Sequence, residues 1–158
     1  MELAHRMWDI LCYQSPVNEV GRISNGRHPG NITSIIKVDQ PFIPNSENNV
    51  MILQESFTSP VGSYIIFAPS NSESMNVAIR GGDSTRMHIL PSGFVVCSNE
   101  KLYGNSKVGS LLTIAYQTLA SSQDGTMMST MEAVANANTL VTNTLVKVKE
   151  ALKSCPWI

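Results

Sequence analysis

The side chains that could do chemistry are few, and their spacing matches no known metal or catalytic site. The three histidines have no carboxylate or thiol at a ligand spacing: His5, His28 and His88. The three cysteines form no Cys-x-x-Cys pair: Cys12, Cys97 and Cys155. An odd, sparse set of cysteines is typical of a reduced intracellular protein. The sequence therefore predicts no metal centre, no cofactor and no disulfide framework.

Two glycine-containing motifs have structural rather than catalytic interpretations. Ser92 lies in Pro-Ser-Gly-Phe, which lacks the Gly-x-Ser-x-Gly frame of a nucleophile elbow. Gly81-Gly82-Asp83 lacks the Lys-Ser/Thr pair of a phosphate-binding loop. We expect a kink or bulge at the first motif and the end of a helix at the second. The chain is therefore predicted not to be an enzyme.

Binding of an apolar ligand is the one small-molecule function that the residue pattern could support. Alternation places Leu112, Ile114 and Tyr116 on one face of a strand. The candidate cavity lining joins them to Val134, Val141 and Leu145 of the following helix. Five methionines could give such a cavity a flexible lining that adapts to the ligand. Ordinary core filling is the simpler interpretation of these residues, which are Met75, Met87, Met127, Met128 and Met131.

The long C-terminal helix carries an apolar stripe at steps of three and four residues, or their sum. Its members are Val134, Val141, Leu145, Val148 and Leu152. We predict that this stripe packs against a sheet. With Asn138 added, the same spacing also fits a zipper, in which Asn138 would set the register. The helix is expected to begin with Ser129 as N-cap and Glu132 three positions later.

The remaining pattern predicts strands joined by short loops, with two further short helices. One helix spans Met1 to Cys12, and the other follows Ser72 as cap and holds Met75 and Ile79. The expected strands are Val17–Ile23, Ile32–Val38, Val50–Phe57, Ser63–Ala68, Met87–Cys97 and the strand from Leu112 to Gln117. The fold class is therefore α+β: an antiparallel sheet of about six strands packed on a long C-terminal helix.

Composition restricts the setting in which this chain works. The 158 residues suit one domain, and the net charge of −1 gives no bulk attraction to nucleic acid. The first residues do not form a signal peptide, and no apolar run is long enough to cross a membrane. The glycosylation pattern Asn31-Ile32-Thr33 would need secretion, so we expect it to be unused. The expected protein is soluble and intracellular, with no membrane insertion.

Ordered motifs along the chain resemble one plant family. They include Trp8-Asp9-Ile10-Leu11, Met51 to Ser56, Gly62 to Pro69, Gly81 to Ser84, Ile89 to Phe94 and Gly109 to Thr113. In this order they are similar to the C-terminal region of class IV homeodomain–leucine zipper transcription factors. That region follows a lipid-transfer-like START domain in the family. The resemblance implies a START-like, helix-grip architecture that is incomplete here.

The resemblance also implies a domain division. Residues 1–7 look like a remnant of the last START helix, and residues 8–158 look like a truncated START-associated C-terminal domain. The family carries a further segment between these parts, whereas Met7 directly precedes Trp8 in this chain. A core lacking that segment would leave apolar surface exposed. We therefore expect a domain that is marginally stable alone and depends on a partner or ligand.

Two functions are considered, the first implied by the family resemblance and the second by the likeness of strands and a long C-terminal helix to helix-grip proteins. The first is a non-catalytic regulatory or interaction domain of a nuclear transcription factor, binding protein partners or the factor's other domains. It would not contact DNA directly, because the homeodomain is not among these residues. The second is a small module that binds a lipid or sterol between sheet and helix.

Overall fold

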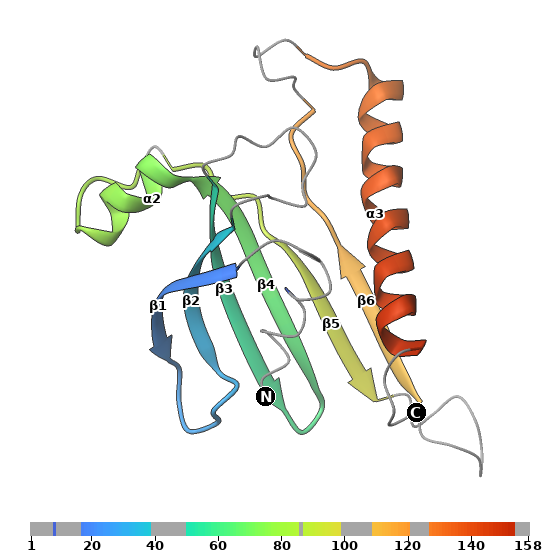
Figure 1. The fold of residues 1–158 in the computed structure, drawn as a ribbon, viewed down its shortest axis with the longest axis horizontal. Helices are drawn as coiled ribbons and strands as arrows, with labels where there is room; N and C mark the ends of the chain where they lie inside the picture. The colour runs from blue at the N-terminus through green and yellow to red at the C-terminus, as the bar shows by residue number, and fades with distance from the viewer. Residues whose placement is uncertain are drawn as a thin grey trace.

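The computed structural model describes residues 8, 17–38, 50–85, 87–98, 109–120 and 127–153. Six strands form one antiparallel sheet whose spatial order follows the chain. They are β1 (Val17–Ser24), β2 (Ile32–Val38), β3 (Val50–Ser59), β4 (Gly62–Asn71), β5 (Ser92–Ser98) and β6 (Ser110–Ala115). The short helix α2 (Ser72–Ile79) follows β4, and the long helix α3 (Thr130–Lys153) lies at the β6 end of the sheet (Figure 1). The predicted α+β class, with six antiparallel strands and a C-terminal helix, is confirmed.

One face of the sheet, the core face, holds the buried apolar residues. Strand register places Ile36 opposite Ile52 and Ile65 opposite Phe94 on this face. The cluster is Trp8, Ile36, Val38, Val50, Ile52, Ile65, Phe67 and Phe94. The predicted alternation in β2 is confirmed, since Ile32, Ser34, Ile36 and Val38 are all buried.

The other face, the reverse face, is only partly covered. At its α2 end, Met51 and Ala68 are buried, as is Met75 of α2. Toward the opposite end the reverse face carries exposed apolar side chains. Phe57 and Tyr64 are directly opposed in β3 and β4, and their rings stack 5.2 Å apart. The sheet therefore has one face that holds the core and one face that is only partly covered.

The hairpin of β3 and β4 is longer than predicted, and its turn is shorter. Pairing continues to Ser59 and Gly62, which leaves only Pro60 and Val61 in the turn. Gly62 has a φ of 157°, and a Cβ there would lie 2.6 Å from the Val96 carbonyl oxygen. A residue with a side chain would therefore collide with β5.

The predicted strand from Met87 to Cys97 is too long at its start. Strand β5 begins at Ser92, and residues 87–91 are not in a strand. Pro91 has no N–H to give to a ladder, which explains why pairing starts after it. Gly93 then allows β4 to approach closely, because a Cβ there would lie 2.6 Å from the Ile65 carbonyl oxygen.

Both described helices begin at side-chain caps. In α2 the cap is Asn71 rather than the predicted Ser72, and the Asn71 Oδ1 accepts the Glu73 N–H at 2.7 Å. The predicted glycine end is confirmed, since Gly81 has a φ of 76° just after α2. In α3 the Ser129 Oγ accepts the Glu132 N–H at 3.2 Å, as predicted for an N-cap. The predicted helix from Met1 to Cys12 lies outside the described residues except for Trp8.

Candidate functional site

The sheet and α3 are joined by a hydroxyl relay at the end of β6. The Tyr116 hydroxyl lies 2.8 Å from the Thr144 Oγ1, which itself donates to the Leu140 carbonyl oxygen at 2.9 Å. Because the Thr144 hydrogen is used in that bond, Tyr116 donates to Thr144. Thr144 and Leu140 are the buried residues of the described helix. This relay positions α3 against the strand that precedes it.

Burial at the relay changes the acidity of Tyr116. Removal from water raises the pKa of the phenol above its ordinary value, and the hydrogen bond with Thr144 opposes that rise in part. The neutral phenol is thus the form that the folded chain favours. At physiological pH the tyrosine acts as a hydrogen-bond donor and not as a base.

The structure places the six predicted lining residues in two separate environments. Leu112, Ile114 and Tyr116 lie together on the core face, half-buried and packed against the cluster, as their alternation predicted. The three helix residues are largely exposed: Val134 by 53%, Val141 by 37% and Leu145 by 41%. Their assignment to a ligand cavity stays a prediction.

The prediction that α3 packs through its valine and leucine stripe is wrong for four of its five residues, since only Val148 is half-buried. Leu140 and Thr144 are buried instead, and Thr144 contacts Tyr116 after β6, whereas Leu152 is 52% exposed. At about 100° per residue, the stripe lies roughly a quarter turn around the helix from this buried edge. Hydrophobicity identified the wrong edge because, apart from Leu140, the buried edge is made largely of small or polar residues, including Ala133, Thr144 and Ala151. A buried tyrosine hydroxyl needs a partner, and that need was the available signal for Thr144.

A polar row crosses the core face, and sequence reasoning missed it. Register aligns Arg22, Ser34 and Gln54 across β1, β2 and β3. The Gln54 Nε2 donates to the Ser34 Oγ at 3.3 Å, and the Trp8 Nε1 donates to the Gln54 Oε1. Gln54 and Ser34 are almost fully buried. This network ties Trp8 to a strand that is 46 residues away in the sequence.

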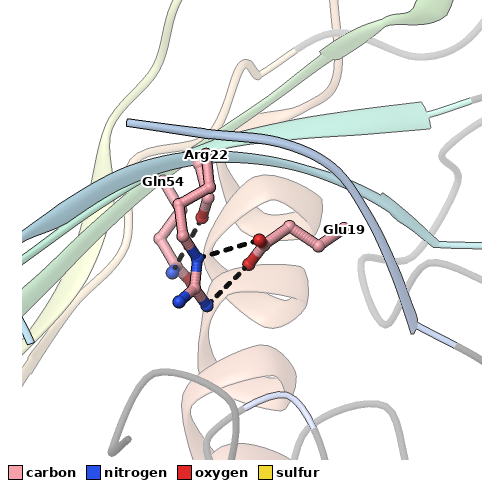
Figure 2. Close-up of polar contacts among 4 residues, drawn as sticks. Glu19, Arg22 and Gln54 are labelled. Atoms are coloured by element: carbon pink, nitrogen blue, oxygen red, sulfur yellow. Dashed lines mark hydrogen bonds and ion pairs between the residues drawn. The ribbon is translucent and has the colours of Figure 1, made fainter. Parts of the chain in front are cut away.

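The outer end of the polar row is an ion pair on β1. The Arg22 guanidinium makes two hydrogen bonds to the Glu19 carboxylate, at 2.9 and 3.0 Å. Figure 2 shows this two-pronged contact with Gln54 in the adjacent part of the row. Both charged side chains are partly exposed, so the pair orients β1 more than it stabilises the fold.

These features can be compared with known proteins. Residues 2–154 match the family described as the PDF2-like C-terminal domain. The chain belongs to that family. This confirms the resemblance to homeodomain–leucine zipper proteins that the sequence motifs indicated.

Several plant homeobox-leucine zipper proteins are similar to this PDF2-like C-terminal domain. ROC4 of Oryza sativa subsp. japonica is 35% identical over 147 residues, which covers 92% of this chain and 18% of the relative. HDG11 of Arabidopsis thaliana is 33% identical over 163 residues, covering 96% of this chain and 22% of the relative. HDG12 of the same plant is 34% identical over 157 residues, which covers 98% of this chain and 22% of the relative. The chain thus spans about a fifth of the length of these relatives. No solved structure matches it.

Three further polar side chains of this PDF2-like domain have structural roles. The Ser92 Oγ is buried and accepts the Gln117 N–H at 3.1 Å, which fixes the chain after β6 to the start of β5. The His28 Nδ1 accepts the Gly30 N–H within a loop. Asn31 is 7% exposed, and its Oδ1 accepts the Thr58 N–H at 2.8 Å. A glycan on Asn31 would therefore disrupt this contact.

Among the described residues, no three His, Cys, Asp or Glu side chains are gathered as metal ligands. Asp83 accepts the Thr85 N–H at 2.9 Å, and this bond lowers the pKa of its carboxyl group. No helix within the described ranges has the length and apolar character needed to cross a membrane.

Proposed function

We propose that this chain is a non-catalytic regulatory and interaction domain of a homeobox-leucine zipper transcription factor. It would work in the nucleus by contacting other domains of its parent factor or separate protein partners. Membership of the PDF2-like C-terminal domain family supports this role, as do relatives named homeobox-leucine zipper proteins. The START-like, helix-grip architecture and the division at residues 7 and 8 belong to the same proposal.

The observation that carries the proposal is the amount of ordered apolar surface left open. On α3, Val134, Leu145 and Leu152 are each more than two-fifths exposed. On the reverse face, Ile66 and Val95 are similarly exposed beside the stacked pair of Phe57 and Tyr64. Scattered apolar residues on a surface are normal, but contiguous stripes on regular elements are typical of interaction sites.

Direct DNA binding is not part of the proposed role. The net charge is −1, so the chain has no general attraction for phosphates. Lys147, Lys149 and Lys153 gather near the C-terminal end of α3, where they complement the helix dipole. Any specific contact with DNA would come from another part of the parent factor.

A reporter experiment tests the interaction role. The chain is fused to an unrelated DNA-binding domain, and transcription from a matching promoter is measured in plant cells. We expect the double substitution Val141→Asp with Leu145→Asp to change reporter output at equal protein levels. The matched control, Asn136→Asp with Asn143→Asp, adds the same charge on exposed positions of the same helix and should change nothing. Equal output from all three proteins would contradict the proposal.

An electrophoretic mobility-shift experiment tests the proposal that this chain does not bind DNA directly. The isolated chain is titrated against plant promoter DNA at moderate salt. We expect no sequence-specific complex. A tight, salt-tolerant complex with one sequence would overturn the exclusion of DNA contact.

A hydrophobic-ligand module is the second candidate, favoured by one observation. Leu112, Ile114 and Tyr116 are half-buried on the core face next to α3 rather than fully enclosed. A lipid or sterol bound there would complete their burial. Native mass spectrometry of the purified chain tests this: a co-purifying lipid that the substitution Ile114→Asp removes supports it. A ligand-free protein that takes up no lipid from mixed vesicles rejects it.

A further inference from the structure

The exposed stripe of α3 follows the spacing of a coiled-coil seam. Steps of three and four residues alternate without a break through Met131, Val134, Asn138, Val141, Leu145, Val148 and Leu152. In heptad terms the a positions are Met131, Asn138, Leu145 and Leu152, and the d positions are Val134, Val141 and Val148. A helix that packs only on its own sheet has no need of an unbroken seam on another edge.

Most of the seam is available to a partner, with Val148 half-buried, because a different edge of α3 is the buried one. Leu140 and Thr144 are buried on that edge, and the Tyr116 hydroxyl is hydrogen-bonded to Thr144. At about 100° per residue, the seam points roughly a quarter turn away from that contact. A second helix could therefore lie along the seam without displacing β6.

The amount of open surface fits a weak, specific contact. The exposed fractions of Met131 (84%), Val134 (53%), Val141 (37%), Leu145 (41%) and Leu152 (52%) leave on the order of 400 Å² of apolar surface on one helix. Two such surfaces facing each other would bury about twice that area. At about 800 Å² in total, this is below the roughly 1,200 Å² of a standard interface, so we expect a weak, transient association with an affinity in the micromolar range or weaker.

The seam is self-complementary, which favours a second copy of the chain as the occupant. The e positions that flank the seam are Ala135, Thr142 and Lys149. The g positions are Thr130, Ala137, Thr144 and Ala151. Lys149 is the one charged side chain among these positions, so no like charges oppose each other in a parallel pair, whereas Thr144 stays buried against its own sheet. Asn138 of each copy meets Asn138 of the other only when the two helices are parallel and in register. A single Asn at an a position fixes register and favours two strands in this way.

We propose that two copies of this chain associate through α3 as a parallel, in-register coiled coil centred on Val141 and Leu145. This proposal rests on the interaction role above and names the partner of that surface. It is distinct from the zipper for which the relatives are named, because it lies in the C-terminal helix of this domain.

Sedimentation velocity over a wide micromolar range tests the association with the complete 158-residue chain. We expect a reversible monomer–dimer equilibrium. Val141→Asp with Leu145→Asp should weaken association by roughly 100-fold or more, since two charges would enter the seam. The control pair Asn136→Asp with Asn143→Asp should leave it unchanged. Circular dichroism on each variant checks that the fold is intact, which is expected because all four positions are exposed.

Substitution of Asn138 by leucine is expected to strengthen association, the opposite of the aspartate substitutions. Asn138→Leu should tighten association by roughly 10-fold or more and produce species larger than dimers, because leucine at a with valine at d favours more strands. A chain that stays monomeric throughout, or a dimer that the Val141 and Leu145 substitutions do not weaken, would overturn the proposal.

Disulfide trapping tests the orientation. In a chain whose own cysteines are replaced by serine, Asn138→Cys should form an intermolecular disulfide rapidly under mild oxidation. Asn143→Cys, on the opposite edge of α3, should not. Efficient trapping at position 143 but not at 138 would contradict the parallel register.

The outcomes separate this inference from the proposed function. If the chain is monomeric but Val141→Asp with Leu145→Asp still alters the reporter, the seam binds a different protein and only self-association is rejected. If the reporter is insensitive while the dimer forms and dissociates as expected, the interaction role in transcription is rejected and the dimer stands.

Discussion

The centre of the sheet and the C-terminal helix carry apolar patterns of similar clarity but differ sharply in burial. At the centre, Ile36, Ile52 and Phe67 are 3%, 1% and 1% exposed. On α3, Val134 and Leu145 are 53% and 41% exposed. The central residues pack against Trp8 and against side chains of neighbouring strands, whereas most of the helix stripe lies about a quarter turn from the buried edge of α3. An apolar pattern therefore identifies a surface that needs a partner, and it does not say whether the partner is in the same chain.

The contrast in burial predicts that the largest loss of stability will come from substitutions at the centre of the sheet. Phe67 packs against Trp8, Phe94 and Tyr116, with ring centroids 5.3, 6.0 and 6.3 Å away. Phe67→Ala should lower the free energy of unfolding by about 3 to 5 kcal/mol. Leu152→Ala on the exposed stripe should cost less than about 1 kcal/mol in the monomer. Urea titration at low protein concentration measures both, and equal losses would refute the contrast.

A second prediction concerns the closeness of β4 and β5. Gly93→Ala would bring a Cβ to 2.6 Å from the Ile65 carbonyl oxygen, so the strands must separate. We expect a loss of about 1 to 3 kcal/mol in unfolding free energy. Gly109→Ala is the matched control, because nothing lies within 4 Å of its added methyl group. Thermal unfolding of the two variants should rank Gly93→Ala clearly below Gly109→Ala.

The hydrogen bond between Tyr116 and Thr144, which joins the sheet to α3, is predicted to make an intermediate contribution to stability. Tyr116→Phe removes the hydrogen bond to Thr144 and should lower the unfolding free energy by about 1 kcal/mol near neutral pH. The pKa of Tyr116 is raised by burial, so its stabilising contribution is complete below the unfolded-state pKa of about 10.

The same contribution is lost as pH rises through the folded-state pKa. The stability difference between the natural chain and Tyr116→Phe should therefore shrink in strongly alkaline solution. Paired urea titrations at neutral and alkaline pH measure this difference. A gap that widens at high pH would show that the phenol is not held in its neutral form.

The smallest predicted effect lies at the start of α3. Ser129→Ala removes the acceptor of the Glu132 N–H and should cost about 0.5 to 1 kcal/mol. Ser129→Asp should preserve the cap and favour the helix dipole, so its stability should match or exceed that of the natural chain. Helical circular dichroism during thermal unfolding tests the pair. A loss in both variants would show that the cap does not contribute.

Local sequence signals predicted most elements because their causes lie within a few residues. The hairpin, the glycine end of α2 and the Ser129 cap depend on turn and capping chemistry between near neighbours. The errors had local causes as well. Pro91 delayed the start of β5, and Asn71 capped α2 in place of its neighbour Ser72. Of the candidate lining, alternation correctly grouped Leu112, Ile114 and Tyr116 on one face.

The position of the helix relative to the sheet could not be predicted in this way. Strand alternation fixes a face, because successive side chains point to opposite sides. A helix presents side chains in every direction, and several edges of α3 are apolar enough to be buried. Hydrophobicity selected Val134, Val141 and Leu145, whereas the edge that packs contains Leu140 and Thr144.

The sequence by itself determined the α+β class, the six strands, the long capped helix and the family to which the chain belongs. These follow from periodicity, turn chemistry and motif order. Only the tertiary structure decided which edge of α3 meets the sheet and which remains open, and only it joined Trp8 to Gln54 across 46 residues. Both depend on hydrogen bonds between side chains far apart in the chain, whose pairing is set by packing and not by local pattern.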